Sequence, residues 1–309
     1  MKALGLRCRA PAKIYEITQK VAVMERVSPL RKVLFRKVLC LFVGCVALAG
    51  STQAQPWPRA EGELFTSPSF SVYSTVRQTN SDGSVSDIPN GGRFTGYRLG
   101  VYFEYGLTPR WTVQGLLNSS YETFSDANVR QRNLSPGDQR IGVRYALLDG
   151  SWAASLGGTV GVPWLYSLDH RPLPGYGQYS AQLNGAIGRG VSFAGNNGWS
   201  LFKAGYRRYF GGASDQLRGQ LLLGLRFTQR WGLLTQLNGT LALQKGRFRL
   251  NQDLSNPNVQ SGYSVLKANA SVMYEYSPRA TVQIGLYREV VGADSGLGGG
   301  GIVSLWYRY

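Results

Sequence analysis

The stretch Gly301-Ile302-Val303-Ser304-Leu305-Trp306-Tyr307-Arg308-Tyr309 decides the fold. From Val303 to Tyr309, every second residue is apolar or aromatic. Successive side chains of a β-strand point to opposite faces, so the stretch predicts a strand with one apolar face. A membrane β-barrel needs such a face, with aromatic rings at the level of the lipid headgroups. The same alternation also fits an edge strand of a soluble β-sandwich, which is the competing interpretation of this segment taken alone.

The stretch resembles the last strand of Gram-negative outer-membrane proteins, which present such a strand to the machinery that assembles them. The resemblance implies that Tyr307 and Tyr309 lie at the membrane interface and that the barrel assembly machinery is a partner during biogenesis. It also implies that the protein resides in the outer membrane, in contact with lipid and lipopolysaccharide.

An N-terminal signal peptide is predicted over residues 1–54. A basic stretch, 31–37, precedes an apolar run over 38–50, and the small residues that follow form a cleavage site after Ala54. The run of 13 residues is too short to span a bilayer, which needs about 20. It is therefore a leader rather than an anchor.

Two details of the leader stay open. Met24 is an alternative start, and the residues before it would then be an over-long n-region. A lipoprotein signal ending at Cys45 is the alternative to the cleavage site at Ala54, although Phe42 stands where a smaller aliphatic residue is usual.

The leader changes what the composition implies. It contains ten Lys or Arg and two Glu, so about +9 of the formal charge of +17 remains on residues 55–309. This excess suits a lumen and lipopolysaccharide phosphates better than nucleic acid, so no nucleic-acid partner is predicted. All three cysteines, Cys8, Cys40 and Cys45, lie in the leader, which excludes disulfides and thiolate metal sites from the mature chain. No metal or cofactor is predicted.

Alternating stretches recur along residues 55–309. From Tyr97 to Tyr105 the odd-numbered residues are apolar or aromatic, and the even-numbered ones are Arg, Gly, Tyr and Glu. Similar stretches run over 138–147, 216–227 and 266–276. Their polar faces mix Gly, Gln, Asn, Ser and Arg rather than the Lys and Glu of a wetted surface, which favours a barrel over a sandwich.

Short and long connections alternate between these strands. Short turns are predicted at 106–110, 149–151, 194–198, 228–230 and 277–279, and longer loops at 79–92, 124–137, 166–177, 245–262 and 291–300, with a tighter one at 211–214. These connections imply about twelve strands, with both termini on the periplasmic side. The predicted fold is therefore all-β: a transmembrane, antiparallel, up-and-down β-barrel over residues 55–309.

Three of the short turns share a pattern, in which a charged residue and an aromatic residue precede the turn and an Arg follows it. The pattern begins at Glu104, Arg226 and Glu275, and it predicts three periplasmic hairpins. A true duplication and convergence on favourable turn chemistry both explain it. The aromatic residues predicted at the membrane interface are Tyr105, Trp111, Phe227, Trp231, Tyr276, Tyr307 and Tyr309.

A wider resemblance covers most of residues 55–309. It is carried by Trp57, Glu61-Gly62-Glu63-Leu64-Phe65, the stretch from Tyr97 to Thr108, Trp111-Thr112-Val113 and the terminal Trp306-Tyr307-Arg308-Tyr309. These segments are similar to the XagA-type outer-membrane proteins. The resemblance implies a barrel associated with biofilm exopolysaccharide made by an inner-membrane glycosyltransferase. It also implies a distant similarity to the barrel family named after the meta-pathway of phenol degradation.

The polar faces of the predicted strands would line the lumen. The charged candidates are Arg98, Glu104, Asp138, Arg140, Arg144, Lys203, Arg207, Arg218, Arg226, Lys267 and Glu275. Cations outnumber carboxylates in this set, so the lumen would attract anions or acidic sugars. In a barrel of about twelve strands, the same charges could instead pair across the lumen and close it.

Catalysis is not predicted. The single histidine, His170, lies in a long loop beside Asp169 and Ser167, and nothing places a nucleophile and a base together on the wall. The sequence thus predicts a porin-like channel for a saccharide or a small anionic solute. The alternative is a closed structural or adhesive barrel without transport activity.

Overall fold

The computed structural model describes residues 56–164, 166–244 and 255–309. The predicted signal peptide and its cleavage site lie outside the described residues, as does part of the loop predicted at 245–262. Within the described ranges, no helix has the length and apolar character that crossing a membrane requires.

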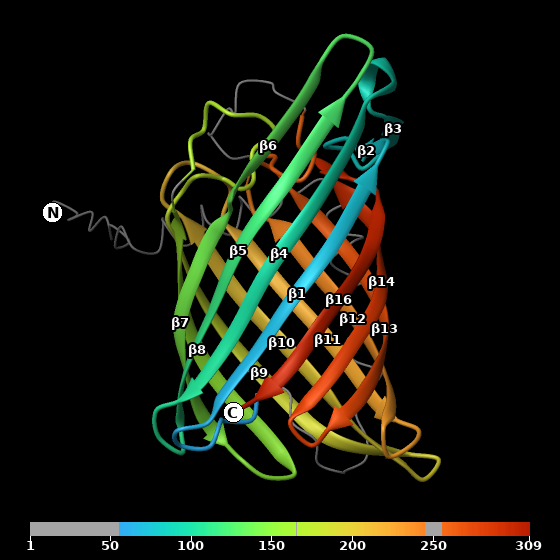
Figure 1. Ribbon diagram of the computed structural model, residues 1–309. Coiled ribbons are helices and arrows are strands. Elements are labelled where there is room, and N and C mark those ends of the chain that lie inside the picture. The colour runs from blue at the N-terminus through green and yellow to red at the C-terminus, as the bar shows by residue number, and fades with distance from the viewer. Residues whose placement is uncertain (1–55, 165, 245–254) are drawn as a thin grey trace, which may run out of the picture. The chain divides into compact units, whose positions relative to one another are not determined.

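Twelve antiparallel strands close into a barrel, so the predicted fold class is confirmed (Figure 1). Each strand pairs with its neighbours in sequence, and the last strand pairs with the first. The strands of the wall are β1 (Leu64–Thr75), β4 (Arg93–Gly106), β5 (Trp111–Ser125), β7 (Asp138–Leu148), β8 (Trp152–Pro163), β9 (Ser180–Phe193), β10 (Asn196–Tyr209), β11 (Gln216–Arg226), β12 (Trp231–Ala242), β13 (Ser264–Ser277), β14 (Ala280–Ala293) and β16 (Gly299–Arg308).

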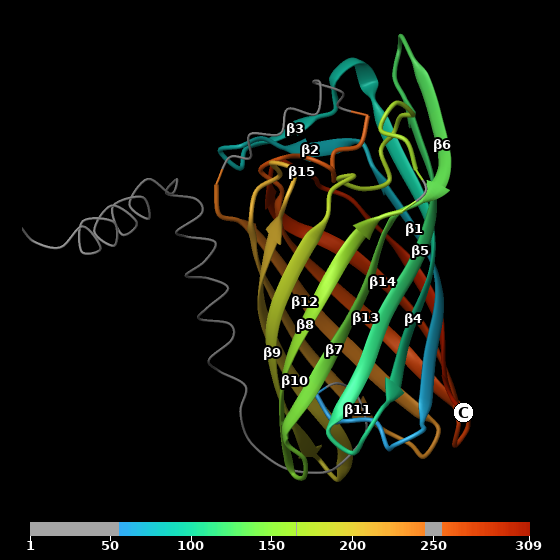
Figure 2. The ribbon, with the colours of Figure 1, turned by 90° about the vertical axis from the view of Figure 1, so that its left-hand side faces the viewer.

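The two ends of the barrel differ. Short turns and the C-terminus lie at one end, whereas longer connections extend from the other (Figure 1). Outer-membrane barrels have short periplasmic turns and long extracellular loops, so the first end is the periplasmic one. At the extracellular end, β2 (Arg77–Thr79), β3 (Val85–Asp87) and β15 (Ser295–Gly296) form a small separate sheet above the wall, with the 3₁₀ turn η1 (Pro89–Gly91) beside it (Figure 2).

Three periplasmic hairpins share one hydrogen-bonding pattern in their turns. In each, a hydroxyl oxygen in the turn accepts hydrogen bonds from two backbone N–H groups at the start of the following strand. Thr108 accepts from Arg110 and Trp111 at 3.3 and 3.0 Å, and Thr228 accepts from Arg230 and Trp231 at 3.2 and 2.9 Å. Ser277 accepts from Arg279 and Ala280 at 3.3 and 3.1 Å. These bonds satisfy turn amides that the strand ladder cannot reach, which explains where the strands end.

Two of the predicted loops are shorter than expected. Most of 124–137 is a hairpin extension, because β6 (Arg130–Pro136) pairs with the end of β5 and leads through Gly137 into β7. The segment predicted as a loop at 291–300 is mostly strand, since β14 runs to Ala293 and β16 begins at Gly299. The polar residues of 124–137 and the glycines of 291–300 predict loops, but strands that rise above the membrane need no apolar face and can contain both.

The outer face of the wall is apolar. Alternate residues of the strands carry large apolar side chains that no described residue covers, such as Leu99 (55% exposed), Ile284 (59%) and Leu286 (74%). A water-exposed wall of this kind would be strongly unfavourable, so these side chains face lipid. The register predicted for β4 and β11 is the one observed, because their even-numbered residues point inward.

Candidate functional site: the barrel interior

The interior of the barrel contains two layers, which the sequence alone does not distinguish. The periplasmic half is filled by side chains and by the segment that precedes β1. The extracellular half contains a chamber under the extracellular loops.

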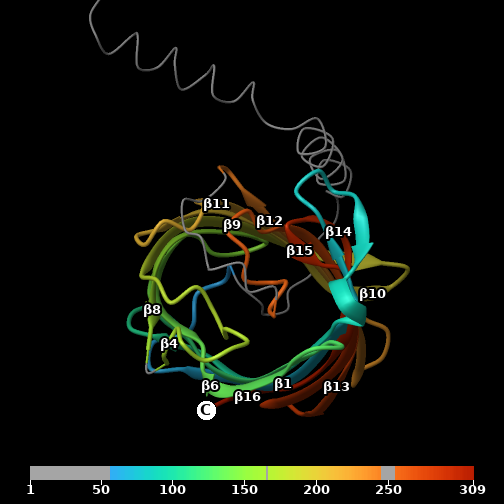
Figure 3. The ribbon, with the colours of Figure 1, turned by 90° about the horizontal axis from the view of Figure 1, so that it is seen from above.

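The segment 56–63 folds into the periplasmic end before β1 begins (Figure 3). The indole Nε1 of Trp57 donates to the carbonyl oxygen of Gly150 at 3.2 Å, and Arg144 donates to the carbonyl oxygen of Trp57 at 3.1 Å. The approach at Gly106 is so close that a Cβ atom there would lie 2.0 Å from the carbonyl oxygen of Ala60. Gly106 is therefore required where this inner segment runs against the end of β4.

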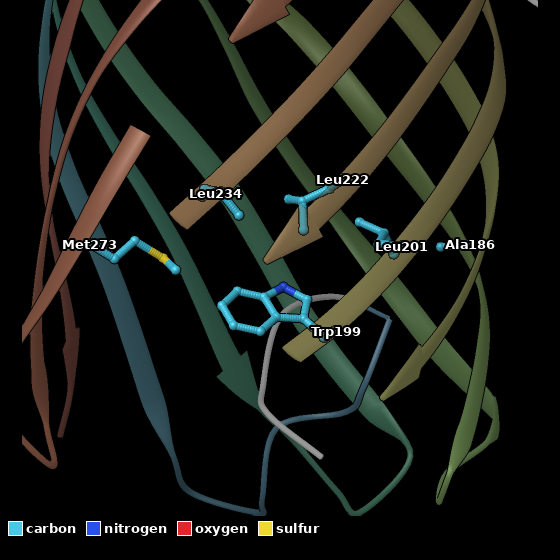
Figure 4. Packing of buried hydrophobic residues seen from close by; sticks show 6 residues of the cluster. All are labelled: Ala186, Trp199, Leu201, Leu222, Leu234 and Met273. Carbon is cyan, nitrogen blue, oxygen red and sulfur yellow. The ribbon is translucent and has the colours of Figure 1, made fainter. Parts of the chain in front are cut away.

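An apolar cluster lies above the inner segment. Its members come from five neighbouring strands and point into the barrel (Figure 4): Ala186, Trp199, Leu201, Leu222, Leu234 and Met273. Trp57 of the inner segment and Trp306 of β16 pack against it. Leu234 is fully buried and Trp199 is 3% exposed, so little space remains at this level of the lumen.

Glu104 is the centre of an ion-pair network beside this cluster. Its carboxylate is fully buried and lies 2.6 Å from Arg59 Nε and 2.8 Å from Arg144 Nη1. Tyr102 donates its hydroxyl to the same carboxylate at 2.6 Å. A buried carboxylate is tolerated when it is paired and hydrogen-bonded in this way. Glu104 thereby joins the inner segment to β4 and β7.

Three further pairs use the predicted lumen charges. Near the periplasmic end, Arg226 lies 2.5 Å from Glu275. Near the extracellular end, Arg98 lies 3.6 Å from Glu122, and Lys267 lies 3.4 Å from Glu289. Lys267 also lies over the rings of Tyr73 and Tyr287, at 5.6 and 5.1 Å from their centres.

The chamber occupies the extracellular half of the interior and has a volume of about 440 Å³. Among the charged residues predicted for the lumen, those that line it are Arg98, Asp138, Arg140, Arg207, Arg218 and Lys267. Lys203 is half-buried on β10, with the same parity as Leu201 and Arg207. Glu104, Arg144, Arg226 and Glu275 lie outside the chamber, in the periplasmic layer.

Three arginines dominate the charge of the chamber. Arg140, Arg207 and Arg218 all line it, and none of them forms an ion pair with a described residue. Arg207 donates from Nε and Nη2 to the amide oxygen of Gln182, at 3.0 and 2.6 Å, which fixes the guanidinium in place. Guanidinium groups remain charged in proteins, so the described lining of the chamber, which also contains Glu122 and Asp138, has a net positive charge.

Two extracellular loops cover the chamber. Asn256 Nδ2 donates to Glu122 Oε2 and to the carbonyl oxygen of Leu173, both at 2.7 Å. Leu173 and Val259, one from each loop, pack with Tyr176, Tyr209 and Ala213 in a second apolar cluster. The Tyr176 hydroxyl also donates to the carbonyl oxygen of Gln260 at 2.8 Å, so the two loops together form a lid.

Tyr166 and Asp138 connect the lid to the wall. The Tyr166 hydroxyl donates to the Asp138 carboxylate, and the amide of Tyr176 donates to the same carboxylate at 3.2 Å. Burial, together with the nearby Asp138 charge, raises the pKa of Tyr166 above its ordinary value, so its hydroxyl stays protonated. Asp138 is thus engaged by lid residues rather than by the arginines.

The aromatic residues predicted at the membrane interface lie near the periplasmic turns. Tyr276 (74% exposed) and Tyr309 (66%) are the most accessible, and Tyr307 is partly covered by the ring of Tyr309, 4.6 Å away. Tyr105, Trp111, Phe227 and Trp231 are all exposed on the same end of the wall. Their role as anchors at the membrane interface stays a prediction.

Several interior residues were not found from the sequence. Glu122 and Glu289 follow the inward parity of β5 and β14, so a complete alternation analysis of those strands would have identified them. Arg59 and Asn256 lie outside the wall strands, where no periodicity marks them. His170 is an exposed loop residue whose carbonyl oxygen accepts from Asn133 at 3.3 Å. The described ranges contain no group of three or more His, Cys, Asp or Glu residues able to hold a metal ion.

No protein-family model matches the chain, and no curated protein matches its sequence. Solved structures are similar in fold. The COG4313 outer membrane channel from Pseudomonas putida F1 has a TM-score of 0.64 at 12% identity, over 84% of this chain and 100% of that one. The translocator domain of the autotransporter NalP from Neisseria meningitidis has a TM-score of 0.43 at 13% identity, over 94% and 98% of the two chains.

The similarity to the COG4313 channel, at 12% identity, shows the fold alone. The chain has the fold of a Gram-negative outer-membrane β-barrel, as predicted. The narrower resemblance to XagA-type proteins is not confirmed by any match and stays a prediction.

Proposed function

We propose that this protein is an outer-membrane channel that passes small anionic solutes, acidic saccharides among them. The barrel fold supports a channel, since a similar solved structure is described as an outer membrane channel. The finer part of the proposal, the class of solute, rests on the chamber.

One observation carries the proposed selectivity: Arg140, Arg207 and Arg218 line the chamber without an ion-pair partner among the described residues. Low-dielectric walls concentrate the field of such charges and raise the local concentration of anions. The volume of about 440 Å³ is in the range of small-molecule sites, roughly 300–1,000 Å³. Of the components of a biofilm exopolysaccharide, only oligosaccharides short enough for that volume fall within the proposal.

A second candidate is a closed surface barrel that does not transport. The filled periplasmic half favours it, because the apolar cluster and the Glu104 network occupy the lumen at that level. In that case the loops would carry the function, as an adhesive or assembly surface. The two candidates differ in a measurable property, which is ion conductance.

Single-channel recording in planar bilayers tests the proposal. We expect the wild-type barrel to conduct and to favour anions, and the variant with Arg140→Gln, Arg207→Gln and Arg218→Gln to shift towards cations, because buried charges are poorly screened by salt. A control variant with Gln at Arg130, Arg132 and Arg208, which are all exposed, should keep the wild-type selectivity. The variant Arg59→Ala removes the ion pair between the inner segment and Glu104. Absence of conductance in both the wild type and this variant would favour the closed barrel instead.

A further inference from the structure

A second cationic site lies outside the lumen, on the outer wall. Arg77, Arg93 and Arg288 line a surface groove of about 360 Å³ at the extracellular end, which we name the rim groove. It runs across the neighbouring strands β14, β16, β1 and β4, where the first strand meets the last (Figure 1). All three arginines are exposed.

Glycines form the floor of the rim groove. A Cβ atom on Gly298 would lie 2.3 Å from the carbonyl oxygen of Ser74, and one on Gly299 would lie 2.8 Å from the carbonyl oxygen of Tyr287. Side chains are thus excluded at both positions by the adjacent strands. The backbone is left uncovered between the flanking arginines, and this leaves room for a ligand.

The arginines of the rim groove have no counter-ion in the described part of the chain. None of them forms an ion pair with a described residue, although Arg77 is the strand partner of Asp87. Among the residues that the structure describes, no carboxylate lines the groove. An anionic ligand would therefore meet little competition from the protein itself.

The position of Arg288 indicates where that ligand comes from. Arg288 shares the outward face of β14 with Leu286 and Val290, which are 74% and 53% exposed. A charge on a lipid-facing wall is costly unless its flexible stem carries it to the polar headgroups. Phe70 and Tyr97, which stack with ring centres 6.4 Å apart, continue the apolar belt below the groove on β1 and β4.

We propose that the rim groove binds the phosphates of lipopolysaccharide, with the bisphosphorylated glucosamine headgroup of lipid A held by Arg77, Arg93 and Arg288. Guanidinium groups bind phosphate oxygens in a bidentate manner, and this face of the barrel meets the outer leaflet, where lipid A is the main lipid. The site lies on the outer wall and does not depend on whether the lumen conducts.

Native mass spectrometry of the full-length barrel in detergent, titrated with bisphosphoryl lipid A, tests the proposal. The variant with Arg77→Gln, Arg93→Gln and Arg288→Gln should bind on the order of 100-fold more weakly, because each basic residue near an anionic lipid surface contributes about a factor of five. The control variant with Gln at Arg110, Arg230 and Arg279 removes three exposed charges from the periplasmic turns and should bind as the wild type does. Monophosphoryl lipid A should bind with intermediate affinity.

Three results would overturn the proposal. Unchanged binding in the rim-groove variant would show that the lipid binds elsewhere, and equal losses in both variants would show unspecific attraction. Displacement of lipid A by inorganic phosphate at the same concentration would identify a free-phosphate site.

Heat-modifiable gel mobility shows whether each variant is folded. The single variant Arg288→Gln removes a charge from a lipid-facing position, so it should fold in any case.

Discussion

The Oε2 atom of Glu104, on the barrel wall, lies 2.6 Å from the Nε atom of Arg59, in the inner segment that precedes the first strand. The other carboxylate oxygen pairs with Arg144 at 2.8 Å, so one fully buried side chain holds two cations. Arg59 also lies 3.3 Å from Glu63, so Glu104 is the carboxylate that links the inner segment to Arg144 of the wall. This link makes Glu104 the most informative position to change.

Glu104→Gln should destabilise the barrel and loosen the inner segment. The change removes the carboxylate that pairs with the buried Arg144 and leaves Arg59 with Glu63 alone, which we expect to lower the free energy of unfolding by about 3–5 kcal/mol. Urea unfolding in detergent, followed by tryptophan fluorescence, measures the loss. Glu61→Gln, at an exposed position of the same segment, is the matched control and should stay within about 0.5 kcal/mol of the wild type. Equal stability of Glu104→Gln and wild type would contradict the described network.

Leu223→Arg should prevent stable insertion. Leu223 is 40% exposed on the lipid-facing side of β11, where a charge near the midplane costs about 2–4 kcal/mol. The adjacent Leu222 would be a poor control, because it belongs to the inward apolar cluster and its replacement by Arg would also be damaging. Gln236, which pairs with Leu222 from β12 and is half-buried and inward, is the better control. Heat-modifiable gel mobility of outer-membrane fractions should show folded Gln236→Arg and little folded Leu223→Arg.

Replacing both Tyr307 and Tyr309 with Ser should impair assembly. The two rings pack 4.6 Å apart at the end of β16, and their loss removes the interfacial anchor of the strand that closes the barrel. Unfolded protein should then accumulate in the periplasm, which cell fractionation can detect. Trp306→Leu provides the comparison, because Trp306 packs on the interior cluster rather than at the outer wall. Normal surface levels of the double variant would argue against the anchoring role.

Asn256→Asp should open the lid over the chamber. The Asn256 amide donates to Glu122 at 2.7 Å, and a carboxylate in its place would repel that side chain. We expect the loop 255–263 to become sensitive to added protease on intact cells. Asn128→Asp introduces the same charge at an exposed extracellular turn and should leave that loop protected. Continued protection of Asn256→Asp would mean that the apolar lid cluster and the Tyr176–Gln260 hydrogen bond hold the loops without the Asn256 amide.

The wall of the barrel could be predicted from the sequence because its pattern is local. Alternation over ten or so residues fixes which side chains face inward, and the spacing of turns fixes the number of strands. Every charged residue predicted for the lumen on β4, β7, β11 and β13 follows the inward parity of its strand. The role of each residue in the interior was not predictable in the same way.

Partners inside a barrel come from strands that are distant in sequence, so the sequence cannot assign them. Arg144 and Arg218 have the same parity and the same charge, yet Arg144 is buried against Glu104 whereas Arg218 lines the chamber. Nor does parity reveal the height of a residue along the barrel, so it does not separate the apolar layer around Trp199 from the polar chamber. The inner segment precedes the first strand and has no periodic signal at all.

The hydroxyl-capped hairpins have a consequence for biogenesis. Thr108, Thr228 and Ser277 complete their turns with bonds to residues two and three positions ahead. Such bonds need no distant partner, so these turns can form in the chain before any wall exists, at little cost in loop entropy. The pairing of β1 with β16, by contrast, joins the two ends of the barrel domain and can only come late. A chain in which these three turns have already formed has fewer ways to pair its strands wrongly before it is inserted into the membrane.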